Sequence, residues 1–254
     1  MNKESTARIA EWLVRADNPV IFTGAGMSTE SGIPDFRSPG GIWSKYRTVY
    51  FDEFMESAEA RHEYWSQKAE GHRDFADAKP NSGHKVIARW EADDLIRGVI
   101  TQNIDGLHQI AGNKNVLELH GTAREIMCMD CGARYECEPL IQAFLKTDQV
   151  PLCEQCADGR LKHATISFGQ SLPAQVLQEA AAWCRTSGLL FAIGSSLVVT
   201  PAADLPVLTQ NHGGYLVIIN RDATPLDELA SEVIHSSIGE TLTAIEHIRQ
   251  SRFV

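Results

Sequence analysis

The sequence predicts an α/β protein with a doubly wound parallel sheet and a smaller inserted domain. Short runs rich in β-branched residues alternate with amphipathic segments along most of the chain. Small or polar residues directly follow several of these runs. They would lie at the carboxyl ends of the strands, where open parallel sheets bind their ligands. Two segments, 34–78 and 121–163, interrupt the alternation, so we interpret them as insertions that come together in space.

The elements of the large domain are predicted from hydrophobic periodicity and from the Gly and Pro residues between runs. A first helix is expected at residues 6–16, because apolar residues recur there at helical spacing and an Asn-Pro pair ends the pattern. We then expect strands at 20–23, 95–101, 116–119, 164–168, 189–193, 215–219 and 232–235, with helices at 82–91, 105–111, 173–185, 201–210, 226–230 and 239–250. The large domain would comprise residues 1–33, 79–120 and 164–254, and the small domain residues 34–78 and 121–163.

Length and charge narrow the class of protein. A chain of 254 residues suits one large domain or two modest ones. The net charge of −10 argues against non-specific nucleic-acid binding, which depends on clustered Lys and Arg. Apolar runs are far shorter than the ~20 residues of a membrane span, and the polar N-terminus is unlike a signal peptide. We therefore expect a cytoplasmic protein that associates with neither nucleic acid nor membrane. We also expect a monomer, although neither length nor charge gives the oligomeric state.

The first candidate binding element is the glycine-rich turn GAGMSTESG at residues 24–32, directly after the strand at 20–23. Glycines there let the backbone approach a phosphate, and a following helix N-terminus offers unpaired N–H groups. The turn is not the dinucleotide fingerprint, because Thr29 occupies the third glycine position. A tight strand-to-helix turn is the alternative. The polar loop at 33–41, with one aromatic residue and one cation, favours a lid over an anionic ligand.

Two further candidates lie at predicted strand ends. The segment TQNIDGLH at 101–108 offers two amides and a carboxylate, although Asn103 or Asp105 could simply cap the next helix. His120 follows the strand at 116–119, where it can act as a general base near neutral pH. A structural histidine is the alternative reading. Weaker candidates follow later strands: Gly-Ser-Ser at 194–196, Asn220, and the extended segment 166–170, which suits strand pairing with a peptide.

Two Cys-x-x-Cys pairs are the strongest local signal. Cys128 and Cys131 precede Cys153 and Cys156, and the 21 residues from 132 to 152 separate the pairs. Four thiolates suit tetrahedral Zn²⁺ in a closed site without an open position for substrate, so this zinc would be structural. Disulfides and an iron–sulfur cluster are the alternatives.

In this order, the motifs resemble those of the sirtuin family of NAD-dependent protein deacylases. The resemblance rests on GAGMSTESGIPDFR (24–37), TQNIDGLH (101–108), LHGT (119–122), the four cysteines, SFGQSLP (167–173) and GSSLVVTPA (194–202). It implies a Rossmann-like large domain and a small domain made of a zinc ribbon and a helical module. We expect a minimal catalytic core like that of prokaryotic members, because long extensions are absent at either end.

The resemblance also assigns residues to ligands. NAD is expected to contact Gly24, Ala25, Gly26, Ser28, Thr29, Asp35, Phe36, Arg37, Trp43, Gln102, Asn103, Ile104, Asp105, His120, Gly194, Ser195, Ser196, Asn220 and Ile238. A substrate peptide is expected against Phe168, Gly169, Gln170, Leu197, Val198 and Val199, with the acyl-lysine entering an apolar tunnel toward His120. One structural Zn²⁺ would be held by the four cysteines named above.

The implied activity is lysine deacetylation that consumes NAD, with His120, Asn103 and Asp105 as the catalytic residues. The acyl oxygen attacks C1′ of the nicotinamide ribose, and His120 acts as general base. The products are free lysine, nicotinamide and O-acetyl-ADP-ribose. Protein mono-ADP-ribosylation, or removal of a longer neutral acyl group, is the alternative. The Tyr-x-x-Arg pair of the family's desuccinylases is absent from residues 43–75, which favours a neutral acyl group. Gln170 and Lys162-His163 also depart from the family pattern.

Overall fold

The large sheet is parallel, as predicted. The computed structural model describes residues 3–35 and 46–253, apart from the side chains of residues 73 and 74. In this part of the chain, six strands pair in parallel in the order β3-β2-β1-β7-β8-β9. They are β1 (Val20–Thr23), β2 (Gly98–Thr101), β3 (Val116–Glu118), β7 (Leu189–Ile193), β8 (Tyr215–Ile219) and β9 (Glu232–Ile234).

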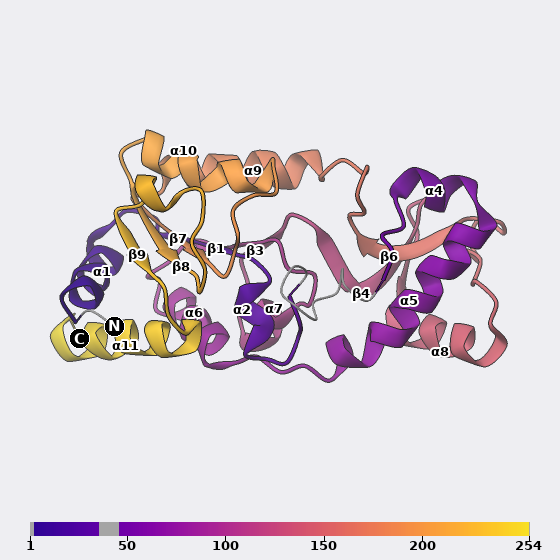
Figure 1. Cartoon of the computed structure of the whole chain (residues 1–254), viewed down its shortest axis with the longest axis horizontal. Helices are drawn as coiled ribbons and strands as arrows, with labels where there is room; N and C mark the ends of the chain where they lie inside the picture. Colours follow the sequence, from indigo (N-terminus) through magenta and orange to yellow (C-terminus); the bar gives the residue numbers. More distant parts are fainter. Residues whose placement is uncertain (1–2, 36–45, 254) are drawn as a thin grey trace.

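Helices cover both faces of this sheet (Figure 1). One face packs against α1 (Lys3–Arg15), α6 (Ser82–Ala92) and α11 (Ile238–Phe253). The other packs against α9 (Ala174–Thr186), the 3-10 turn η1 (Ala202–Asp204) and α10 (Leu205–Asn211). The central strands are buried on both faces, which explains why they are continuously apolar instead of alternating.

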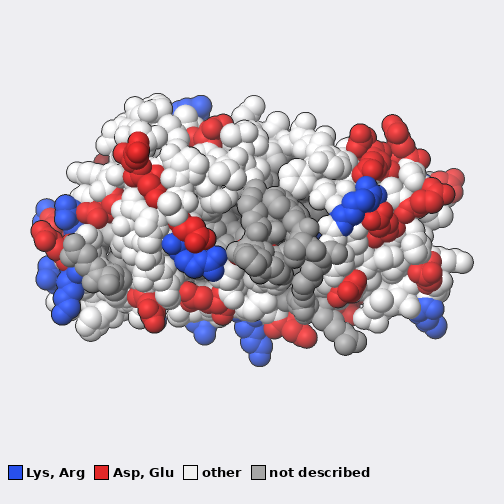
Figure 2. Space-filling model, viewed as in Figure 1, with Lys and Arg blue, Asp and Glu red and all other residues white. Residues whose placement is uncertain are grey.

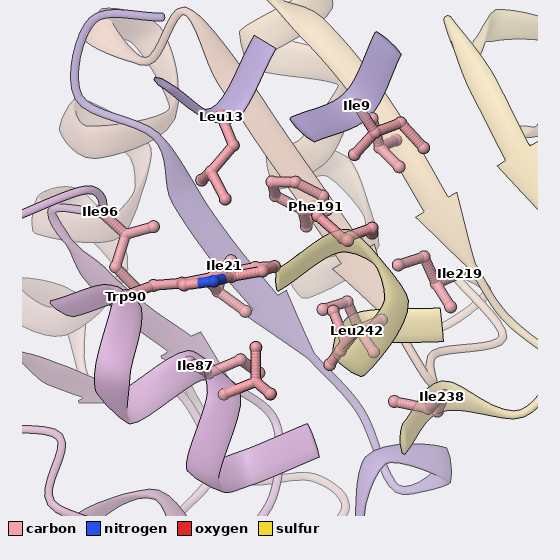
Figure 3. Close-up of a cluster of buried hydrophobic side chains, with 14 of the residues drawn as sticks. Ile9, Leu13, Ile21, Ile87, Trp90, Ile96, Phe191, Ile219, Ile238 and Leu242 are labelled. Atoms are coloured by element: carbon pink, nitrogen blue, oxygen red, sulfur yellow. The ribbon is translucent and has the colours of Figure 1, made fainter. Parts of the chain in front are cut away.

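The first of these faces forms a dense core. Figure 3 shows Ile9 and Leu13 of α1, Trp90 of α6 and Leu242 of α11 converging on the strands. The indole Nε1 of Trp90 donates a hydrogen bond of 2.9 Å to Glu246, so even the polar edge of this ring has a partner.

A second, antiparallel sheet lies at the other end of the molecule (Figure 1). It contains β4 (Gly121–Cys128), β5 (Arg134–Glu136) and β6 (Leu161–Thr165), in the order β5-β4-β6. Three helices pack with it around a separate apolar cluster: α4 (Phe51–Glu56), α5 (Ala58–Ala76) and α8 (Cys137–Thr147). The two interrupting segments of the sequence therefore do come together.

The strand predicted at 164–168 is wrong in position and in partner. The observed strand β6 ends at Thr165 and pairs with β4, so it belongs to the small sheet and not to the parallel one. All five residues of β6 are buried, and that pattern imitates a central strand of a parallel sheet. The strand predicted at 95–101 begins only at Gly98, whose positive φ of 156° marks the entry.

The remaining elements are short. They are α2 (Gly26–Thr29), α7 (Leu107–Ala111) and η2 (Asp227–Leu229). Within the described residues, no helix combines the length and the apolar character that a membrane crossing requires. On the face in Figure 2, carboxylates gather over α4 and α5 while basic side chains are scattered.

Replacing Leu242 by Ala tests the core shown in Figure 3. Leu242 is fully buried, so the change removes apolar contacts and leaves a cavity that the neighbours fill only in part. We expect the free energy of unfolding to fall by about 2–5 kcal/mol, measured by urea titration. Leu145→Ala is the matched control, because Leu145 is 56 % exposed and its truncation should cost below about 0.5 kcal/mol. Equal effects of the two variants would contradict this description of the core.

Candidate active site and metal centre

A large cavity opens where the strand order reverses. Strands β1 and β7 are neighbours, yet the chain leaves them toward opposite edges of the sheet, and ligands bind at such points. The cavity measures about 1160 Å³ and is lined by the turns that follow β1, β2, β7 and β8. Its other wall comes from α5 and from the segment that follows β6, so it lies between the two sheets.

Three glycines bring two of these turns into backbone contact. A Cβ on Gly24 would lie 2.8 Å from the carbonyl oxygen of Gly194, and one on Gly26 would lie 2.8 Å from its Cα. Gly194 itself has φ +63°, and a Cβ there would lie 2.3 Å from the backbone nitrogen of Met27. The glycines of the predicted phosphate turn are therefore required by packing, whatever ligand they approach.

A buried hydrogen-bond network fixes the side chains of the 101–108 segment. Ser28 donates to the carboxylate of Asp105 at 2.7 Å, and Asn103 donates to Ser28 at 3.1 Å and to the carbonyl of Gly24 at 3.0 Å. Asp105 also accepts from the backbone nitrogen of Leu107, the first residue of α7. Asp105 thus accepts from the first turn of α7 and also belongs to the buried network. Helix capping and a place in the binding site, which the sequence offered as alternatives for Asp105, are therefore compatible.

His120 is held in one orientation. Its Nδ1–H donates to the backbone carbonyl of Gln102 at 2.9 Å, which leaves the lone pair on Nε2. Burial lowers the pKa of His120 below its usual value, although the bond to Gln102 opposes this shift. The ring therefore stays neutral near pH 7 and able to accept a proton. The amide of Gln102 in turn donates to Ser195 at 2.8 Å, which ties the β2 end to the β7 end.

Most of the residues expected to contact NAD line this cavity. They are Gly24, Ala25, Gly26, Thr29, Asp35, Gln102, Asn103, Ile104, His120, Gly194, Ser195, Ser196, Asn220 and Ile238. Two others, Ser28 and Asp105, are buried behind the wall, where they orient Asn103. Phe36, Arg37 and Trp43 lie outside the described residues.

The residues expected to hold a peptide divide into two groups. Phe168, Gly169, Gln170 and Val199 line the cavity. Val198 is half exposed beside it, while Leu197 is buried in the core with φ +53°. The backbone carbonyl of Phe168 accepts from the backbone nitrogen of Phe51 at the start of α4. The side of the cavity that contains Phe168 is therefore bonded to a helix of the small sheet.

The sequence predicted no contacts for several residues of the site. Thr23 donates to Thr101 at 2.8 Å and contacts Nε2 of His108 at 3.1 Å, which links the ends of β1, β2 and α7. Glu30 lines the cavity and accepts from the backbone nitrogen of Gly239 at the start of α11. Such partners are distant in the sequence, so only the fold shows them.

The four predicted cysteines gather as a group that could hold a metal ion. Their sulfur atoms all lie within 4.8 Å of one another, with Cys128 and Cys156 at 3.7 Å and Cys131 and Cys153 at 3.6 Å. Tetrahedral zinc with Zn–S bonds of about 2.3 Å places sulfur atoms ~3.8 Å apart, so the donor set fits Zn²⁺. A Cβ on Gly159 would lie 2.4 Å from two of these sulfurs, which explains that glycine.

Comparison with known proteins decides the family. The family model described as "Sir2 family" matches residues 24–201. The chain belongs to the Sir2 family. A Rhodopseudomonas palustris protein named "NAD-dependent protein deacetylase" is 45 % identical over 237 residues, which cover 92 % of this chain and 93 % of that protein. A Thermotoga maritima protein of the same name is 45 % identical over 213 residues, 84 % of this chain and 85 % of that protein.

Solved structures of Sir2 enzymes agree in fold. One described as "Sir2-p53 peptide-NAD+" superposes with a TM-score of 0.87 at 37 % identity, covering 97 % of this chain and 98 % of that one. Another, "Structure of Sir2Tm bound to a propionylated peptide", gives 0.85 at 37 % identity with the same coverage. The predicted sirtuin resemblance and the Rossmann-like fold with a zinc ribbon are therefore confirmed.

Replacing Cys128 by Ala tests the metal centre. We expect the purified variant to carry no zinc and to unfold at a lower temperature, because a structural zinc contributes directly to folding. Zinc content per chain by mass spectrometry and thermal unfolding are the measurements. Cys184→Ala is the matched control, since this buried cysteine lies in α9 and outside the cluster. One zinc per chain in the Cys128→Ala protein would contradict the assignment.

Proposed function

We propose that this Sir2-family protein is an NAD-dependent protein lysine deacetylase. The observation that carries the proposal is the orientation of His120, whose Nε2 is left as an acceptor in the cavity that Asn103 and Gln102 also line. Relatives named as NAD-dependent protein deacetylases match over nearly the whole chain. The acyl-lysine peptide partner comes from the same comparison, because related Sir2 structures are described with acetylated or propionylated peptides.

Residues at different strand ends have different roles in binding NAD and in proton transfer. Asn103, oriented through Ser28 by the buried Asp105, presents an amide suited to the carboxamide of nicotinamide. Gly194, Ser195 and Ser196 with Asn220 would hold the adenosine side, where close backbone approach and short hydroxyl side chains suit ribose oxygens. His120 takes a proton from the ribose hydroxyls, so that the acyl group passes to the ribose. NAD bound here would supply the electrophilic ribose carbon. With the acetyl group of the lysine and one water, the products would be nicotinamide, O-acetyl-ADP-ribose and free lysine.

Other parts of the sequence prediction remain proposals. We assign residues 34–78 and 121–165 to the small domain, two residues beyond the predicted boundary because β6 ends at Thr165. The apolar cluster that α4, α5 and α8 share with its sheet supports this division. The cytoplasmic location, the monomeric state and the absence of nucleic-acid binding also stay predictions. Mono-ADP-ribosyl transfer remains the second candidate, because it shares the loss of nicotinamide.

The deacetylase proposal is tested with one acetyl-lysine peptide, with and without NAD, followed by mass spectrometry. We expect loss of acetyl only with NAD, together with O-acetyl-ADP-ribose. His120→Ala should lower kcat/KM by about 10²–10⁴-fold, the usual contribution of a general base, while NAD binding stays within a few-fold. His247→Ala, an exposed histidine on α11, is the matched control and should keep full activity.

Two other results would contradict parts of the deacetylase proposal. Full activity of His120→Ala would remove the general base. Consumption of NAD without loss of acetyl, with ADP-ribose appearing on protein, would support the transferase instead.

The pH dependence of kcat/KM tests the state of His120. Burial lowers the pKa of this imidazole, and the base works only when neutral. Activity should therefore persist on the acidic side and fall to half at a pH below 6.5, the usual value for histidine. The pH profile is measured with the acetyl peptide at subsaturating concentration. A midpoint at or above 6.5 would show that burial does not control this group.

A further inference from the structure

The small sheet and its helices bring together a second group of metal-ligating side chains, besides the four cysteines. Cys137 begins α8, and its Sγ lies 3.2 Å from Nε2 of His163 on β6. The same sulfur lies 4.0 Å from Nδ1 of His72 on α5. Glu138, the next residue of α8, lies 2.5 Å from Nε2 of His72. A thiol, two imidazoles and a carboxylate from three different elements therefore meet at one place.

The contacts of His72 are those of a metal ligand. In the neutral ring, Nε2–H donates to the carboxylate of Glu138, which leaves the lone pair on Nδ1, the nitrogen nearer to Cys137. Histidines that bind metals commonly donate their other ring N–H to a carboxylate, because this bond fixes the ring and makes the ligating nitrogen more basic. Glu138 is therefore placed to orient His72 toward an ion beside the sulfur of Cys137.

The imidazole of His163 is buried with the thiol as its polar contact. Its Nδ1 makes no hydrogen bond within the described residues, and the ring packs against the aromatic rings of Tyr64 and Trp65. Burial holds the pKa of His163 well below its usual range, so the ring is neutral, as a metal ligand must be. His163 also departs from the sirtuin pattern, so the NAD and zinc sites of the family do not account for it.

The group adjoins two cavities. Cys137, Glu138 and His72 line a small cavity of about 160 Å³. His72 and His163 also line the large cavity of the candidate active site. Because His72 lies in the wall of both, an ion can approach Cys137 from the large cavity, and the small cavity has room for a water molecule beside the ion.

We infer that Cys137, His163 and His72 bind one Zn²⁺, in addition to the zinc of the four cysteines, with Glu138 orienting His72. Thiolate and imidazole are ligands that zinc prefers. Bond lengths of about 2.3 Å to sulfur and about 2.0 Å to nitrogen place these two atoms ~3.5 Å apart in a tetrahedral site. The observed distances of 3.2 and 4.0 Å lie on either side of that value.

The free site is open and would close around the ion. Among the described residues, only the four cysteines form a group whose donor atoms all lie within 4.8 Å of one another, so an imidazole of the second group must move inward. His72 can do so more easily than His163, because its side chain is 14 % exposed and His163 is buried. Burial raises the pKa of Cys137 to about 11, so zinc binding would release one thiol proton to solvent.

The inference does not depend on the deacetylase proposal, because zinc binding is measured without NAD or peptide. Three protein ligands leave a fourth position for water. An ion at this place would join α5, α8 and β6, and two of these elements contribute residues to the wall of the large cavity.

The zinc content of the full-length protein tests the inference. After dialysis against excess Zn²⁺ and removal of the unbound ion, native mass spectrometry should find two zinc ions per chain in the wild type. Cys137→Ser and His72→Gln should each keep one, and that remaining zinc shows that the variant still folds around the four cysteines. Cys184→Ser, at a buried cysteine of α9, and His62→Gln, at a half-exposed histidine of α5, are the matched controls and should bind two.

Co²⁺ added to the protein that holds one zinc gives an independent measurement. An ion bound by Cys137 should produce a thiolate-to-cobalt charge-transfer absorption that disappears in Cys137→Ser, whereas exchange at the four cysteines would persist in that variant. One zinc per chain in the dialysed wild type would overturn the inference. A second zinc that survives both Cys137→Ser and His72→Gln would also overturn it, because the ion would then be bound elsewhere.

Discussion

The site depends on the direct backbone contact between the turn after β1 and the turn after β7. No side chain separates Gly24 and Gly26 from Gly194, so the two strand ends meet at the distance of packed backbones. This contact fixes where α2, which contains Ser28, begins and where Ser195 meets Gln102. Hydrogen bonds then extend the fixed geometry outward, through Ser28 to Asn103 and through Gln102 to His120. A small rigid contact thereby determines the position of groups on three strands.

The small sheet supplies what the large sheet lacks. A parallel sheet presents its strand ends to solvent, and a ligand bound there is covered on one side only. Here α5 and the segment after β6 provide the opposite wall. Both adjoin the small sheet, and the cysteine cluster joins the segments of that sheet. The metal centre therefore supports the shape of the cavity from a distance, without touching it.

The large sheet, most of its helices and the cysteine cluster were predictable, because each depends on local periodicity or on spacing along the chain. The strand at 164–168 was not, since a fully buried strand shows the same apolar pattern in either kind of sheet. Gly24 and Gly26 were recognised as special, yet the pattern gave no sign that their partner is Gly194.

His120 occupies the junction between the two sheets. Strand β3 of the large sheet ends at Glu118 and β4 of the small sheet begins at Gly121, so the histidine lies in the connection between them. The backbone nitrogen of Ile166 donates to the carbonyl of His120 at 2.9 Å, and Gly121 pairs with Thr165. The segment that enters the small sheet at β4 and the segment that leaves it after β6 therefore lie side by side at His120. A rotation of one sheet relative to the other about this place would move the far walls through long arcs and His120 through a short one. Among the groups of the site, His120 is therefore the one whose position depends least on the angle between the two sheets.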